Sequence, residues 1–192
     1  VPQMIWTKRR DSGSNSLIMW HYGMNSASNA HQYYCIMHTN AAEANYDWTG
    51  GNGAPTATQV KMVTNHNTWY DSGNSSQYIA YLFASVPQIC KLGYYTGNGS
   101  TQTITTDFTP NMIYVKCVSN TSHHMYFDNE YGRLASTTAN DEVMTFDVNQ
   151  QQHTANDYID NISSTGFGLT NASSGDYHVN TNGYRYVYWA HG

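Results

Sequence analysis

The chain has 192 residues, enough for one or two compact domains, and carries a formal net charge of −5. Only 11% of its residues are charged, and its 8 lysines and arginines are scattered apart from Lys8-Arg9-Arg10, so no nucleic-acid-binding surface is expected. No apolar run approaches the roughly 20 residues of a membrane helix, so no membrane insertion is expected either.

The composition favours strands over helices. The 17 tyrosines and the many threonines suit a pleated sheet, while the abundant asparagine, glycine and serine suit the turns between strands. No window shows a convincing helical period. Many short strands at spacings of about ten residues predict an all-β fold made of antiparallel β-sandwich or jelly-roll domains.

The first half of the chain predicts strands separated by polar turns. The last of them, Tyr78 to Ala84, is an almost continuous apolar run, which indicates burial at the centre of a sheet. Strands are expected at residues 4–8, 17–21, 33–38, 59–64 and 78–84, with turns at 11–15 and 71–75 and a Gly/Pro loop at 48–55.

The second half predicts the same succession behind a lead-in of two extra strands. These strands, at 92–95 and 101–104, flank a hairpin turn at 96–100. Residues 156–163 are expected to make at most a single helical turn. Further strands are expected at 112–118, 124–128, 143–148, 166–170 and 184–190.

Two sequence motifs occur once in each half. Pro-x-Met-Ile, an aromatic residue and a lysine occur within residues 2–8 and again within 110–116, and residues 64–84 align with 170–190 without a gap. A repeat of about a hundred residues has the size of a domain, so we expect two tandem β-sandwich domains, residues 1–84 and 85–192. Because the first copy lacks the lead-in strands, we expect it to have an open sheet edge that preceding sequence or a neighbouring subunit fills.

The cysteines do not predict a disulfide framework, because Cys35, Cys90 and Cys117 are odd in number. We expect all three to be small buried hydrophobic residues, which is compatible with assembly in a reducing cytoplasm.

No residue pattern predicts a metal site or a cofactor. Cys35 and His38 are possible zinc ligands, but no second pair of ligands follows. The adjacent His123 and His124 would face opposite sides of a strand. Histidines of several chains meeting on a symmetry axis are an alternative that one chain's sequence does not test.

The carboxylates form no recognisable catalytic pair. Asp128 and Glu130 are close in sequence, but a glycosidase needs two carboxyl groups roughly 5–10 Å apart across a cleft, which proximity in sequence does not establish. We therefore expect no enzymatic activity, with a glycan hydrolase as the weaker alternative.

Two aromatic clusters are the candidate binding residues. Tyr46-Asp47-Trp48 and Trp69-Tyr70-Asp71 lie next to predicted turns. There the rings can stack on the faces of sugars while the carboxylates bind hydroxyl groups. The alternative is packing in the core or in a subunit interface, because large aromatic residues dominate both.

Five segments occur in this order along the chain: residues 78–99, 108–116, 126–132, 160–169 and 184–190. Taken together, they resemble a repeated domain of tailed-bacteriophage virion proteins of the cyanophage type, which are often described as tail fibre or structural proteins. The resemblance implies a concanavalin- or laminin-G-like β-sandwich and brings no catalytic residues with it. In the first half, Trp48 with Ala54-Pro55-Thr56 resembles the mid-domain loop of that family. Because laminin-G-like sandwiches can bind calcium through loop aspartates, the resemblance also makes Asp157 and Asp160 candidate calcium ligands, although turn capping explains them as well.

The sequence therefore predicts a non-enzymatic structural and adhesive virion component, such as a tail fibre, spike or capsid-surface appendage. We expect it to be assembled in the host cytoplasm and to lie at the virion surface. Its expected partners are further copies of itself in a homotrimer, other virion proteins and host surface glycans, with no cofactor. The alternative is a secreted, extracellular microbial module that binds carbohydrate or forms filaments.

Overall fold

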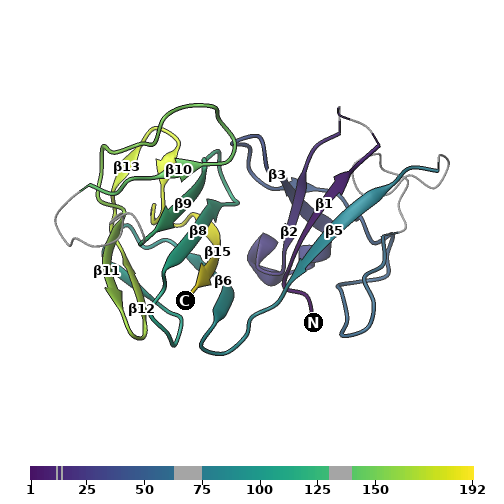
Figure 1. Cartoon of the computed structure of the whole chain (residues 1–192), viewed down its shortest axis with the longest axis horizontal. Coiled ribbons are helices and arrows are strands. Elements are labelled where there is room, and N and C mark those ends of the chain that lie inside the picture. The colour runs from purple at the N-terminus through teal and green to yellow at the C-terminus, as the bar shows by residue number, and fades with distance from the viewer. Residues whose placement is uncertain (12, 14, 63–74, 130–139) are drawn as a thin grey trace.

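A computed structural model describes residues 1–11, 13, 15–62, 75–129 and 140–192 (Figure 1). Antiparallel strands dominate, and the only helices among these residues are two short 3-10 helices, Met24–Ala27 and Ala30–Gln32. The prediction of an all-β fold with antiparallel sheets is therefore confirmed. No described helix is long and apolar enough to cross a bilayer.

The first sheet is built from the first half of the chain and has five strands in the order β4-β3-β2-β1-β5 (Figure 1). Its inner strand β1, next to the edge strand β5, places Met4 opposite His21 of β2 on one side and Phe83 of β5 on the other. The strands are β1 (Met4–Arg9), β2 (Ile18–His21), β3 (Tyr33–Ile36), β4 (Ala44–Asn45) and β5 (Tyr78–Phe83).

The second sheet has five strands in the order β10-β9-β8-β15-β6. Two smaller sheets, β11-β12-β7 and β13-β14, accompany it. The strands of the second sheet are β6 (Cys90–Thr96), β8 (Met112–Cys117), β9 (His124–Asp128), β10 (Met144–Thr145) and β15 (Arg185–His191). Those of the smaller sheets are β7 (Gln102–Thr105), β11 (Ile159–Ser163), β12 (Gly166–Leu169), β13 (Ser173–Ser174) and β14 (Tyr177–His178).

The second sheet is buried on both faces, as its inner strand β15, between β8 and β6, shows. Tyr186 and Tyr188 belong to a core that β7, β11 and β12 also line. Val187, which lies between them on the opposite face, belongs to a second core together with Met4 and Trp20 of the first sheet. A strand covered on both faces is expected to read as a continuous apolar run, and β15 does so.

Polar contacts also join the two halves of the chain. The Lys116 ammonium donates to the carbonyls of Ser122 at 2.6 Å and of Asn40 at 3.2 Å. Arg185 forms an ion pair of 2.7 Å with Glu43, whose own side chain is almost fully covered. The two halves therefore share a core and a buried polar seam, while the domain boundary after residue 84 stays a prediction.

The two five-stranded sheets have the same strand order over four strands. The orders β3-β2-β1-β5 and β10-β9-β8-β15 place Met4 and Met112 on strands with corresponding neighbours. The sheets differ at one edge, because β6 covers β15 whereas no described strand lies beyond β5. The tandem repeat itself stays a prediction.

The predicted burial of the strand after Tyr78 was wrong. β5 is an edge strand, and 40% of Ile79, 50% of Tyr81 and 52% of Leu82 is exposed. An apolar run predicts that a segment is buried, but it does not show whether the residues that bury it belong to the same chain or to another one.

Two other expectations need correction. Residues 59–62 form no strand, and residues 63–64 lie outside the described part of the chain. The segment expected to contain a helical turn contains β11 instead, because pairing with β12 outweighs the weak strand propensity of its Asp and Asn residues. Of the cysteines, Cys35 and Cys117 are buried and unpaired as expected, whereas Cys90 is only half-buried.

Candidate functional site

The first predicted aromatic cluster serves the fold in this structure. None of the surface of Trp48 is exposed, and its ring packs edge-on against Trp20 at 5.7 Å. The Asp47 carboxylate accepts hydrogen bonds from the backbone of Thr49 at 2.9 Å and of Gly51 at 2.8 Å. Burial opposes ionisation of Asp47, but these hydrogen bonds outweigh it and hold its pKa below the usual value.

Tyr46 is half-buried and packs against the core that the two halves share. The second predicted cluster, Trp69, Tyr70 and Asp71, lies outside the described residues. The glycan role of these positions therefore stays a prediction, and the buried ring of Trp48 is not available to stack on a ligand.

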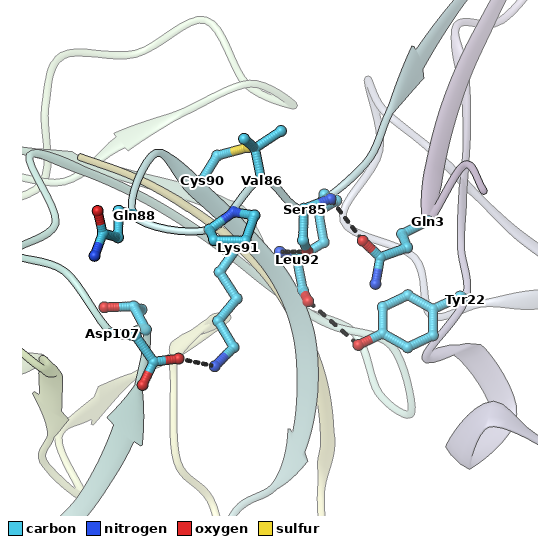
Figure 2. A pocket seen from close by; sticks show the side chains of 11 residues that line it. Gln3, Tyr22, Ser85, Val86, Gln88, Cys90, Lys91, Leu92 and Asp107 are labelled. Atoms are coloured by element: carbon cyan, nitrogen blue, oxygen red, sulfur yellow. Dashed lines mark hydrogen bonds and ion pairs between the residues drawn. The ribbon is translucent and has the colours of Figure 1, made fainter.

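A cavity of about 540 Å³ lies where the two sheets meet (Figure 2). Its volume is within the usual range for small-molecule sites. One wall comes from the first sheet, the other from β6 and the residues after β7, and the link between β5 and β6 runs between them. The lining residues are Gln3, Tyr22, Ser85, Val86, Pro87, Gln88, Cys90, Lys91, Leu92, Thr106 and Asp107.

Three hydrogen bonds fix this cavity to the sheets (Figure 2). The backbone N–H of Ser85 donates to the Gln3 Oε1 at 2.6 Å, and the Ser85 Oγ accepts from the backbone of Leu92 at 2.9 Å. The Tyr22 hydroxyl donates to the Leu92 carbonyl at 3.2 Å. The bonds tie the end of β5, the start of β6 and the first sheet to one another, so the walls hold their spacing.

The opposite wall carries the only two charged side chains among the described residues that line the cavity. The Lys91 Nζ donates to the Asp107 Oδ2 at 3.1 Å, and both side chains reach solvent, with 34% and 71% of their surfaces exposed. Because the two charges neutralise each other, the cavity attracts neither anions nor cations strongly.

The backbone of the cavity is strained at two points. Gln88 has φ 63° and Asp107 has φ 70°, a left-handed conformation that residues other than glycine rarely adopt. Figure 2 shows their side chains on the same wall, beside Lys91. Such outliers cluster at functional sites, where the surrounding structure enforces them.

The remaining surface of the cavity combines a ring with aliphatic groups. The Tyr22 ring lies edge-on to Tyr94 at 5.5 Å, and burial raises the pKa of the Tyr22 hydroxyl, which therefore stays protonated as a donor. Val86, Pro87 and Leu92 supply apolar surface next to it.

The histidines of the second half have separate partners. The His123 Nδ1 lies 2.7 Å from the Asp147 carboxylate, whereas the His124 Nδ1 lies 2.7 Å from the Tyr114 hydroxyl. Burial lowers the pKa of His124 to about 3, so its ring is neutral near pH 7. Within the described ranges, no group of three or more His, Cys, Asp or Glu side chains is arranged to hold a metal ion.

The candidate carboxylates that the structure describes lie in different environments. Asp128 is buried at the end of β9, and Glu130 lies outside the described residues, so the distance between the two stays untested. Burial, followed by the charge of Asp160, raises the pKa of Asp157. Asp160 lies on β11, away from the cavity lining.

Sequence reasoning did not find the cavity. Its residues come from four separate segments, and none belongs to an aromatic cluster next to a turn. The sequence does not predict the left-handed conformations of Gln88 and Asp107 either, because neither residue is glycine. The pairing of β6 with β15 brings the lead-in segment to the junction, and this contact cannot be read from sequence alone.

One protein-family profile, described as a domain of unknown function, matches residues 1–192. No curated protein and no solved structure matches the chain.

Proposed function

The chain belongs over its whole length to the family DUF7483, and we propose that it is a non-enzymatic structural and adhesive component of a virion surface appendage such as a tail fibre. The resemblance of its sequence segments to phage virion proteins supports the location. The surface of the first sheet supports the structural role, and the cavity at the junction supports the adhesive role.

The observation that carries the structural role is the open edge of β5. Four consecutive residues, Ile79 to Leu82, are exposed, and none of them is charged. Soluble proteins usually protect such edges with lysine, proline, a bulge or a covering segment. β5 contains neither lysine nor proline, and its pairing with β1 is regular over six residues.

The second sheet indicates what fills this edge. There β6 pairs with β15 along seven residues, at the place that corresponds to the side of β5 on which no described strand lies. We propose that a strand from a second copy of the chain occupies the corresponding place beside β5. An interface of this kind, repeated around an axis, builds the homotrimer expected for a fibre.

Sedimentation equilibrium tests the structural role. The wild-type chain is expected to sediment as a trimer. Leu82→Lys places a charge on the proposed interface and is expected to give monomers. Val148→Lys, at a residue that is similarly exposed but lies outside the strands, is the matched control and should leave the trimer intact.

A wild-type chain that stays monomeric at all concentrations would contradict the structural role. So would a Leu82→Lys variant that associates as strongly as the wild type.

A further inference from the structure

We propose that the cavity between the two sheets binds a neutral saccharide, with Lys91, Asp107 and the amides of Gln3 and Gln88 as its hydrogen-bonding groups. The inference rests on the adhesive part of the proposed function, for which it names the site and the class of ligand.

The charges of the cavity select a neutral ligand. The Lys91 Nζ and the Asp107 Oδ2 are 3.1 Å apart, and no other charged residue lines the cavity within the part of the chain that the structure describes. An anionic ligand would compete with Asp107 for the ammonium, and a cationic ligand would compete with Lys91 for the carboxylate. A sugar hydroxyl both donates and accepts, so it can bind the two groups without separating them.

The amides of the cavity supply further donors and acceptors. The Gln3 Oε1 is used by Ser85, while its Nε2 makes no hydrogen bond within the described residues. The Gln88 amide makes none there either, and it lies near Asp107 on the same wall (Figure 2). A ligand with several hydroxyl groups can satisfy these groups from both sides of the cavity.

The apolar part of the lining is complementary to the apolar faces of a sugar ring. A pyranose ring presents C–H groups on its faces, and these pack on aromatic and aliphatic side chains. The Tyr22 ring, Pro87 and Leu92 provide such a surface next to the polar groups.

The strained backbone indicates that the polar wall is preorganised. The N–H groups of Thr106 and Asp107 both donate to the Thr165 carbonyl, at 2.8 and 3.2 Å, which holds Asp107 in its left-handed conformation. In the segment just before Lys91, the N–H groups of Ile89 and Cys90 donate to the Val86 carbonyl at 3.1 and 3.0 Å. These bonds fix the turn that carries Gln88. A preorganised site loses less entropy on binding than a flexible one.

The cavity is open and its ion pair is exposed, so a single site is expected to bind weakly. Several copies of the chain in one appendage would present several sites to the same surface, and linked sites of this kind gain avidity by orders of magnitude. Weak binding by the isolated chain therefore suits an adhesive role.

The test follows backbone amide shifts of the ¹⁵N-labelled full chain during titration with sugars. The probes are glucose, galactose, mannose and N-acetylglucosamine as neutral sugars, and N-acetylneuraminic acid as an acidic one. At least one neutral sugar is expected to shift the amides of Tyr22, of residues 85–86 and 88–91, and of Asp107.

Two variants change the polar groups of the cavity without disturbing the backbone: Asp107→Asn removes the carboxylate charge and replaces one accepting oxygen with an NH2 donor, and Gln88→Gly removes an amide. Asp107→Asn and Gln88→Gly both tolerate a left-handed conformation, and each is expected to weaken binding about tenfold. Ser26→Gly is the matched control for Gln88→Gly, because Ser26 also has a positive φ, is exposed and lies outside the cavity. It should bind like the wild type, and unshifted amides elsewhere will show that each variant is folded.

The inference is overturned if no neutral sugar shifts these amides, if only the acidic sugar does, or if both variants bind like the wild type. Oligomer formation is measured separately by sedimentation. A monomeric chain that binds sugar as expected would refute the structural role alone, and an intact trimer without sugar shifts would refute the saccharide site alone.

Discussion

The ammonium of Lys116 lies in the interior between the two halves of the chain, with none of the residue's surface exposed. Burial lowers the pKa of its amino group. Its two carbonyl partners, on Ser122 and Asn40, come from different halves. A buried donor with this geometry joins loops together, so we assign Lys116 a structural role.

Replacing this lysine should destabilise the fold. Lys116→Met keeps the length of the side chain but leaves the Ser122 carbonyl without its 2.6 Å donor. An unsatisfied buried carbonyl costs about 1–3 kcal/mol, which urea unfolding can measure. Lys61→Met, at an exposed lysine, is the control and should change stability by less than about 0.5 kcal/mol. Equal stabilities of the two variants would contradict the role of Lys116.

Asp141 should give the stability a distinct dependence on pH. Burial raises its pKa from the usual 3.8 to about 7, although its Oδ2 accepts from the backbone of Tyr158 and Ile159. Between these two pH values the folded state holds a proton that the unfolded state has lost. The contribution of Asp141 to stability is therefore complete below about pH 4 and is lost as the pH rises through 7.

Asp141→Asn removes this titration. The free energy of unfolding of the variant, minus that of the wild type, is expected to rise between pH 4 and 7 and then to level off. A difference that does not change with pH would show that the carboxyl group titrates normally. Urea unfolding at a series of pH values measures it.

At the scale of the element, the local sequence pattern predicted the positions of the strands well. It predicted poorly which neighbours pack against each strand. β9 begins and ends where the sequence places it, and β1, β2 and β8 differ by one residue at an end. The two-residue strands β4, β13 and β14 were missed, because so short a segment carries no periodic signal. The exposure of β5 depends on which strands surround it, and so does the convergence of Gln88 and Asp107 on one cavity.

The pairing of β6 with β15 should depend on the absence of a side chain at Gly93. A Cβ added there would overlap the ring of Tyr188, which the same pairing places opposite. Gly93→Ala is therefore expected to lower stability by about 1–3 kcal/mol in urea unfolding. Gly13→Ala is the control, because a Cβ at Gly13 meets no atom within 4 Å and should have little effect. A neutral Gly93→Ala variant would contradict the close packing of these strands.

At the scale of the whole molecule, the shared core makes the two halves depend on each other. Val187 and Tyr114 of the second sheet are fully buried in the same cluster as Met4 and Trp20 of the first. We therefore expect one cooperative unfolding transition, in which amide exchange from β2 and from β8 reports the same opening free energy. Val187→Ala should lower both values together. Two transitions, or a change confined to one half, would favour two independent domains.

The proposed structural role depends most on the open edge of β5, and amide exchange of that strand measures whether the edge is covered in the assembled chain. Hydrogen–deuterium exchange of residues 78–83 would be compared at protein concentrations below and above the association midpoint. We predict that the amides of β5 that point away from β1 become protected in the assembled chain and that Leu82→Lys abolishes this protection, while the buried amides of β8 do not change. Exchange in β5 that is equally fast at both concentrations would contradict assembly through this edge.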